Sequence, residues 1–366
     1  MTLLEEGQII RDTYEVERFL GQGAFAEVYR VKHRFLGRQA MKVFKRVGMR
    51  IEEIHDILGE AILLSRIGHP NIIRVFDANV FESPGGTCGY FTMENIPGGS
   101  LDKFWRSFGS AFVPVETTVD LVKQVCRGLA QAHQEKPPII HRDIKPQNIL
   151  VGYEPDGLRA RVSDFGLARK VNPLTLLATA AGTLQFKPPE AFVQHKGDSP
   201  AADVWAIGTT LYLLLTDRLP VEMPEGATWA TKHLFDEAII APTEINPDIS
   251  RGLAKVVMRA LEKSPENRFP SAREFLHDLA AAPLHDQTGP ALRKSLSSEP
   301  SKVVFGSPSP LDSSRARVLV EKALEARGGG RLGEAADLME EAFNKSPDLR
   351  TKYAHQVKLW RCGISM

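Results

Sequence analysis

The chain has 366 residues, of which 43% are hydrophobic and 25% charged, as in an ordinary globular protein. Its 46 Lys and Arg residues balance 45 Asp and Glu residues, so net charge points to neither a nucleic-acid nor a membrane partner. The N-terminus lacks the features of a signal peptide, and the most apolar run, 204–215, is shorter than the ~20 residues that cross a bilayer. Three scattered cysteines form no disulfide framework or metal-ligand spacing, which fits a reducing cytoplasm.

The N-terminal part of the chain alternates in the manner of paired strands. Strands are predicted over 14–20, 28–33, 38–44, 72–76 and 89–93. Between the first two lie Gly21 and Gly23, and glycines let a backbone approach phosphates closely. A strand on both sides argues against the dinucleotide-binding fingerprint, in which a helix follows the glycines. A plain glycine-rich hairpin turn is the alternative at this point.

A lysine in the third strand has a candidate partner further along the chain. Lys42 lies on the same face of its strand as Ala40 and Phe44. Such a lysine is usually a solvated edge residue. Here Glu60 opens an apolar helical face that ends at Gly68, so an ion pair with Lys42 is a second interpretation.

The segment His141–Asn148 follows a helix predicted over 118–134 and combines three chemical roles. Asp143 can accept a proton, Lys145 can neutralise charge and Asn148 can ligate a metal. Phosphoryl transfer needs these roles, because positioning and electrostatics stabilise its transition state. A hairpin separates the segment from Asp164, so the carboxylates of Asp143 and Asp164 can face one cleft. Taken alone, the segment also fits a surface loop of mixed charge.

Together these motifs resemble the protein-kinase family in order and approximate spacing, over roughly residues 14 to 280. Gly182–Glu190 matches the end of a kinase activation segment, and Asp203–Gly208 matches the start of the central helix of the larger lobe. Arg268 stands where the family places the arginine that pairs with the glutamate ending that segment, here Glu190. The chain departs from the pattern at Ala26, where a third glycine is usual, and at Pro188, where alanine is usual.

The resemblance implies an α+β, two-lobed protein-kinase fold, with a small β-rich lobe containing one helix and a larger, mainly helical lobe. A short all-α tail should follow. The implied organisation is an N-terminal lead at 1–13, a kinase domain at 14–280 (small lobe 14–96, large lobe 97–280), a flexible Pro/Ser-rich linker at 281–314 and a helical tail at 315–366.

The resemblance also implies the roles of the site residues. Asp143 would be the catalytic base, and Lys145 would neutralise the transferred phosphoryl group. Lys42, fixed by Glu60, would anchor the α- and β-phosphates of ATP. Asn148 and Asp164 would hold Mg²⁺, or Mn²⁺ as an alternative. The nucleotide would be covered and lined by Leu20, Gly21, Gln22, Gly23, Ala24, Phe25, Ala26, Val28, Ala40, Met93, Glu94, Ile96 and Leu150.

Three features narrow the implied activity to a serine/threonine protein kinase of the bacterial, eukaryotic-like type. Lys145 is the serine/threonine form of the loop, and Thr183 agrees, because serine/threonine members use that threonine to brace the catalytic Asp and Lys. The short lead and compact lobes resemble the bacterial enzymes. One alternative is a pseudokinase scaffold, which usually lacks the strand lysine or a catalytic or metal-binding Asp. The other is a small-molecule phosphotransferase, which usually lacks the 182–190 and 203–208 elements.

Two regions raise questions of regulation and partners. Thr175 and Thr179 are candidate phosphorylation sites, with Arg142 as the residue that would receive the phosphate; polar loop filler is the alternative. The tail is predicted to form helices over 315–326 and 333–345, as a tetratricopeptide-type repeat or a generic helical hairpin. Because ~3 such repeats are normally needed to bury a core, the tail should dock on the kinase lobes, self-associate or bind a partner protein.

Overall fold

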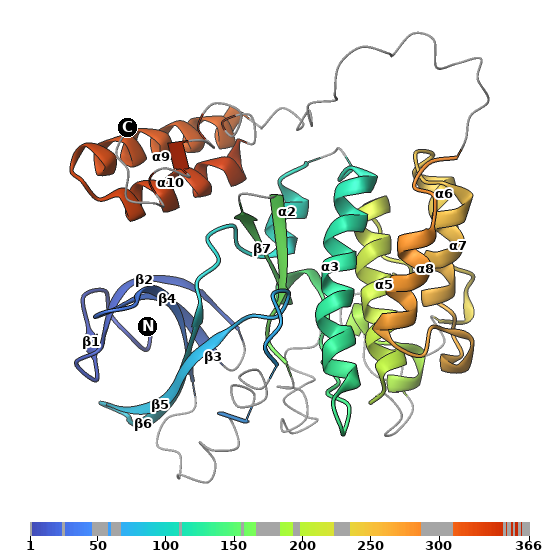
Figure 1. Ribbon diagram of the computed structural model, residues 1–366, viewed down its shortest axis with the longest axis horizontal. Coiled ribbons are helices and arrows are strands. Elements are labelled where there is room, and N and C mark those ends of the chain that lie inside the picture. Colours follow the sequence, from blue (N-terminus) through green and yellow to red (C-terminus); the bar gives the residue numbers. More distant parts are fainter. Residues whose placement is uncertain are drawn as a thin grey trace.

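The computed structural model describes residues 2–23, 26–45, 58–59, 67–109, 112–154, 157–165, 184–192, 198–222, 235–286 and 310–346, with single positions 349, 353, 356, 357 and 360. Within these ranges the chain forms a β-rich lobe, a helical lobe and a separate helical hairpin (Figure 1).

The small lobe is an antiparallel sheet in the order β1-β2-β3-β4-β6-β5. Its strands are β1 (Ile9–Ile10), β2 (Tyr14–Gln22), β3 (Ala26–His33), β4 (Gly37–Phe44), β5 (Val75–Ser83) and β6 (Gly86–Glu94). Alternation along β3 and β4 divides their side chains between the two faces. Tyr29 and Met41 enter a core enclosed by the small lobe, whereas Ala26 and Ala40 join the core that continues into the large lobe.

The predicted strands are confirmed, except that the strand expected over 72–76 begins at Val75. The preceding residues pair with the large lobe instead. Ile72 forms an isolated parallel bridge to Val162, and the Ile73 N–H donates to the Val162 carbonyl oxygen at 2.9 Å. The helix expected around Glu60 is described only at 58–59, so Glu60 lies outside the described residues.

The large lobe is a helical bundle that also contains a two-stranded β-hairpin (Figure 1). Its helices are α2 (Leu101–Arg106), α3 (Val115–Gln134), α5 (Pro200–Thr216), α6 (Pro242–Ile245), α7 (Arg251–Ala260) and α8 (Ala272–Ala281). The hairpin consists of β7 (Ile149–Glu154) and β8 (Gly157–Val162). None of the described helices is both long and apolar enough to span a bilayer.

Helix α5 is the centre of the large lobe and is buried over almost its whole length. The Ser199 side chain caps it by accepting from the Ala202 N–H, and Pro200 occupies its first turn, where no N–H donor is needed. Asp217, in the left-handed region at φ 57°, ends it. Helices α3, α7 and α8 pack around it, so α5 provides a rigid base for the loops at its N-terminal end.

The tail forms α9 (Pro310–Gly328) and α10 (Leu332–Lys345), which pack against each other. Helix α9 begins at Pro310, which lies inside the segment predicted as linker (281–314). Both the repeat and the hairpin interpretations predict this pair. The hairpin lies beside β2 and β4 of the small lobe (Figure 1).

Gly98 permits the close approach of the two lobes. A Cβ atom at this position would lie 1.9 Å from the carbonyl oxygen of Val151 in β7. Because that oxygen belongs to the backbone, it cannot rotate away, and Gly98→Ala should lower the free energy of unfolding by ~1–3 kcal/mol. Urea unfolding measures this. Gly68→Ala is the matched control, since a Cβ there meets no atom within 4 Å; equal losses in both variants would contradict the prediction.

Candidate active site

The backbone at the start of the loop His141–Asn148 is held by a side chain from the first turn of α5. Asp203 accepts hydrogen bonds from the N–H of His141 at 2.8 Å and the N–H of Arg142 at 2.9 Å. Its Oδ2 also lies 3.0 Å from Nε2 of His133. Arg142 has φ +68°, a left-handed conformation that costs energy for a residue with a side chain. These two backbone hydrogen bonds stabilise the loop in that strained conformation.

His141 connects the loop to the segment that carries Asp164. Its Nδ1 accepts from the Asp143 N–H at 3.2 Å, so Nε2 donates to the Ser163 carbonyl oxygen at 2.8 Å. Burial lowers the pKa of His141, which favours the neutral ring with one donor and one acceptor. The ring also contacts that of Phe165 at a centroid distance of 4.5 Å. His141 therefore fixes the spacing between the loop that carries Asp143 and the segment that carries Asp164.

The structure brings the three predicted loop residues together. Lys145 Nζ lies 2.9 Å from Asp143 Oδ2. The Asn148 amide nitrogen donates to Asp143 twice, to Oδ2 at 2.9 Å and to the carbonyl oxygen at 2.8 Å. The Lys145 ammonium and the Asn148 amide thus both hold Oδ2 of Asp143, and a general base needs its carboxylate fixed in this way.

Lys42 and Asp164 meet across the two lobes. Lys42 Nζ lies 2.5 Å from Asp164 Oδ1, and its ammonium lies 5.5 Å from the centre of the Phe91 ring. Asp164 has φ +62°, and its side chain is 31% exposed. Burial acts to raise the pKa of Asp164, but the Lys42 ammonium holds it below its usual value, so the carboxylate stays ionised. The predicted Lys42–Glu60 pair lies outside the described residues.

Seven of the predicted nucleotide-lining residues belong to the apolar core shared by the two lobes or pack against it. Ala26, Ala40 and Met93 are buried in the apolar core shared by both lobes. The partly buried residues that pack against this core include Leu20, Val28, Ile96 and Leu150. Two strands, β4 and β6, place Ala40 directly opposite Met93.

The glycine-rich turn connects β2 and β3. Gly21 and Gln22 pair with Val28 and Glu27 across β2 and β3, and the Gly23 N–H donates to the Ala26 carbonyl oxygen at 2.8 Å. The tip residues, Ala24 and Phe25, lie outside the described residues. The turn is thus a β-hairpin, as expected for a loop flanked by strands.

Glu94 ties the connection between the lobes to β8. Its Oε2 lies 3.0 Å from Nε of Arg161, and its N–H donates to the Arg74 carbonyl oxygen at 2.9 Å. Burial raises the pKa of Glu94, an effect that Arg161 opposes. The side chain of Glu94 is therefore used in this interlobe contact, which leaves a role in nucleotide binding to its backbone.

Asn148 and Asp164 offer a donor set that fits Mg²⁺. The Asn148 amide nitrogen points to Asp143, so its oxygen is the atom available for a cation. Asp164 supplies an ionised and partly exposed carboxylate. Mg²⁺ prefers such oxygen ligands and is commonly bound by one or two carboxylates together with substrate phosphates.

A buried ion pair supports the end of the segment that precedes α5. Arg268 binds Glu190 through both terminal nitrogens, at 2.6 and 2.7 Å, as the sequence pattern predicted. The Arg268 side chain is 0% exposed and also donates to the carbonyl oxygens of Glu262, Lys263 and Ala201. This arginine connects three segments of the large lobe.

Sequence reasoning missed two residues that hold the loop beginning at His141. Asp203 was recognised as part of a motif but not as the acceptor that fixes the backbone of this loop. Lys187 donates through Nζ to the Arg142 carbonyl oxygen. Burial lowers the pKa of Lys187, whereas the negative charge of Asp143 raises it. No pattern within the sequence distinguishes this lysine from a solvated one.

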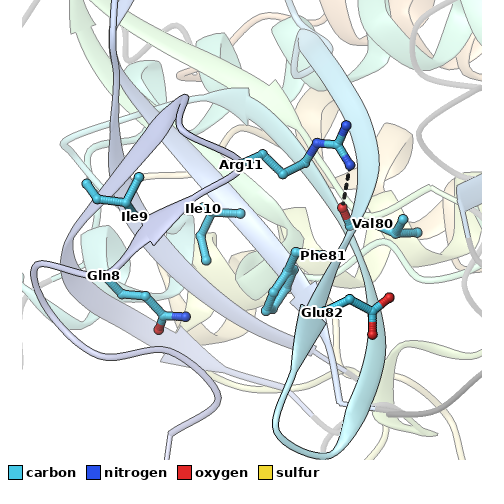
Figure 2. Close-up of a pocket in the computed structure, with 7 residues that line it drawn as sticks. All are labelled: Gln8, Ile9, Ile10, Arg11, Val80, Phe81 and Glu82. Atoms are coloured by element: carbon cyan, nitrogen blue, oxygen red, sulfur yellow. Dashed lines mark hydrogen bonds between the residues drawn. The ribbon is translucent and has the colours of Figure 1, made fainter.

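A pocket of about 260 Å³ lies elsewhere, at the edge of the small lobe between β1 and β5 (Figure 2). Arg11 crosses it and donates to the Val80 carbonyl oxygen at 3.2 Å. Ile10 and Phe81 in its wall belong to the core enclosed by the small lobe rather than to the interlobe core. None of the predicted site residues lines it.

Comparison with known proteins points the same way as the geometry. Residues 14–279 match the model of the protein kinase domain. A probable serine/threonine-protein kinase of Clostridium acetobutylicum is 32% identical over 278 residues, covering 75% of this chain and 40% of the relative. Serine/threonine-protein kinase PknB of Mycobacterium tuberculosis is 32% identical over 278 residues, covering 74% of this chain and 43% of the relative. The chain thus spans less than half the length of these relatives.

Solved structures show the same fold. The crystal structure of the PknI kinase domain of Mycobacterium tuberculosis matches with a TM-score of 0.56 at 27% identity. The match covers 76% of this chain and 99% of that domain. It agrees with the β-rich small lobe and helical large lobe described above.

Proposed function

Since this chain belongs to the protein kinase family, we propose that it is a serine/threonine protein kinase, of the kind found in bacterial signalling. It would transfer the γ-phosphoryl group of ATP to Ser or Thr hydroxyls of protein substrates. The observation that carries the proposal is that Lys145 and Asn148 both contact Oδ2 of Asp143, in a chain that also pairs Lys42 with Asp164. Pseudokinases usually lack the strand lysine or one of the two aspartates. Lys42, Asp143 and Asp164 are all present here, and each contacts an oppositely charged side chain, which disfavours a pseudokinase scaffold.

Asp143, Lys145 and Lys42 would each have a separate role in the phosphoryl transfer. The Asp143 carboxylate would accept the hydroxyl proton of the substrate, and the Asn148 amide, which donates to Oδ2, holds the carboxylate in place for that transfer. Lys145, next to Asp143, would stabilise charge on the transferred phosphoryl group. Lys42 would exchange its contact with Asp164 for the α- and β-phosphates of ATP.

The same arrangement would hold the metal. Asp164 and the amide oxygen of Asn148 are the candidate ligands, with the nucleotide phosphates completing the shell. When bound, Mg²⁺ neutralises charge developing on the phosphate oxygens. The apolar side chains of Ala40, Met93 and Leu150 would pack against the adenine ring, with backbone groups of Glu94 and Ile96 as its hydrogen-bonding partners.

A transfer assay tests the proposal. Purified protein is incubated with γ-labelled ATP and Mg²⁺, with one acidic and one basic protein as acceptors, followed by phosphoamino-acid analysis. We expect label on phosphoserine or phosphothreonine. Nucleotide binding without any transfer would support the scaffold alternative, and label on a small molecule alone would support a small-molecule phosphotransferase. Phosphoproteomics of cells carrying wild type or Asp143→Asn would then identify the substrates.

Phosphorylation at Thr175 or Thr179 remains a prediction, because both lie outside the described residues. The described residue that would receive the phosphate is Arg142, whose Nε lies 2.7 Å from Oδ1 of the exposed Asp198. A phosphate carries more charge than a carboxylate and could replace Asp198. Mass spectrometry after incubation with ATP should find phosphate between 170 and 181. Its absence there would remove the prediction, and Asp143→Asn, which cannot phosphorylate itself, is the control.

The cytoplasmic location and a protein partner for the tail stay predictions. They rest on the cysteine pattern and on the small size of the helical hairpin.

A further inference from the structure

The helical tail has its own apolar core. Ala323, Ala335, Met339 and Phe343 pack together, with Trp360 joining them from the end of the chain. Over the described residues, this cluster is distinct from the apolar cores of the two lobes. The hairpin therefore does not need a lobe to bury its apolar side chains, and its contact with the small lobe must be held by other interactions.

Those interactions are ionic. Asp337 and Glu341 lie four residues apart on α10, so they share one face of the helix. Asp337 Oδ2 accepts from Arg38 NH1 at 2.8 Å and lies 3.7 Å from Arg30 NH1. Glu341 Oε2 lies 3.2 Å from Arg18 NH1. The Asp337 side chain is only 5% exposed, so this pairing is largely removed from solvent screening.

The three arginines occupy adjacent strands and crowd one another. Arg18 on β2 is the direct cross-strand partner of Arg30 on β3. Like charges placed directly opposite destabilise a sheet. Burial lowers the pKa of Arg30, and the charges of Arg18 and Arg38 lower it further, while Glu17 and Asp337 oppose the shift. Glu17 Oε2 lies 2.6 Å from Arg30 Nε and 2.9 Å from Arg38 Nε, and the acids of α10 supply the remaining neutralisation.

This cluster lies on the face of the sheet that holds the nucleotide-lining residues. Arg30 pairs with Ala40, and Val28 pairs with Lys42, so all four side chains share one face. Along β4, Arg38 precedes Ala40 by two residues and Lys42 by four, which corresponds to about 7 and 13 Å. The acids of α10 thus act on the strands that carry the glycine turn and Lys42.

We propose that the α9–α10 hairpin is a reversible electrostatic latch on the nucleotide face of the small lobe, and that its docking through Asp337 and Glu341 tightens nucleotide binding. The docking is intramolecular, because residues 287–309 tether the hairpin to the large lobe. Release leaves Arg18 and Arg30 facing each other, which loosens β2 and β3 at the glycine turn. The coupling to nucleotide rests on the proposed function; the docking does not.

The test compares two double variants of equal charge change. Asp337→Asn with Glu341→Gln removes both latch acids. Glu321→Gln with Glu325→Gln removes two exposed acids of α9 and is the control. Hydrogen exchange reports docking, and calorimetric titration with the Mg²⁺–ATP complex reports affinity. The latch variant should show faster exchange over 14–22 and 26–33 and a Kd raised by ~5-fold or more. The control should match wild type.

Salt and charge exchange give further readouts. Raising salt from about 0.1 to 1 M shortens the screening length from ~10 to ~3 Å. It should weaken the partly exposed Arg18–Glu341 pair, and so bring the exchange of wild type part of the way toward that of the latch variant. Glu341→Arg should speed exchange, because it places a like charge against Arg18, and adding Arg18→Glu should restore it, since each is the other's partner.

The outcomes separate the parts of the proposal. Unchanged exchange in the latch variant would refute the docking. Faster exchange with an unchanged Kd would refute the coupling. A wild type that binds no nucleotide would refute the proposed function and the coupling, while the exchange measurement would still decide the docking.

Discussion

Replacing Asp143 by Asn should lower kcat for phosphoryl transfer by ~10²- to 10⁴-fold, the range typical of losing a general base. The amide cannot accept the hydroxyl proton at neutral pH. The fold should survive, because an asparagine oxygen at this position can still accept from the Asn148 amide, as Asp143 Oδ2 does at 2.9 Å. Affinity for ATP should therefore remain near that of wild type.

The measurement separates turnover from binding. Steady-state assays give kcat, and titration with the nucleotide gives Kd for each protein. Asp236→Asn, an exposed aspartate of the large lobe, is the matched control and should leave both unchanged. A purified Asp143→Asn variant with wild-type turnover would overturn the assignment of the base.

Loss of the Arg268–Glu190 pair should destabilise the large lobe more than any other change considered. Arg268→Met leaves the Glu190 carboxylate unpaired and removes donors from carbonyl oxygens that include those of Glu262 and Lys263. Removing one partner of a buried ion pair costs ~3–5 kcal/mol. Methionine fills much of the vacated volume, so the loss reports mainly the missing charge and hydrogen bonds.

Urea unfolding followed by fluorescence gives the change in midpoint and slope. Arg106→Met is the control, because Arg106 pairs with Asp102 at 3.0 Å while its side chain is 65% exposed. Removal of such a surface pair should cost less than ~1 kcal/mol. Equal midpoints for Arg268→Met and wild type would show that the buried pair contributes nothing to stability.

The candidate catalytic residues could be predicted from the sequence, because phosphoryl transfer requires particular residue types at short spacing. Asp143, Lys145 and Asn148 lie in one loop, and the structure joins them by direct contacts. The pairing of Arg268 with Glu190 was also predictable, since the motif around each residue is specific.

Residues that act through the backbone could not be found in this way. Nothing near Asp203 in the sequence shows that its carboxylate accepts from His141 and Arg142, about 60 positions earlier. The sequence also predicted a strand over 72–76. In the structure Ile72 pairs with Val162 instead, so β5 begins only at Val75. Asp337 and Glu341 look like an ordinary solvated helix face, so sequence left three destinations open for the tail, of which the structure shows docking on the small lobe.

The hydrogen bonds of Asp203 have a consequence for the order in which the protein folds. A nascent chain that ends before α5 already contains Lys42, Asp143, Lys145, Asn148 and Asp164. It lacks the carboxylate that holds Arg142 in its left-handed conformation. The loop that carries Asp143 therefore reaches its folded conformation only after α5 has been made and has packed into the large lobe, when the other residues of the candidate site are already present.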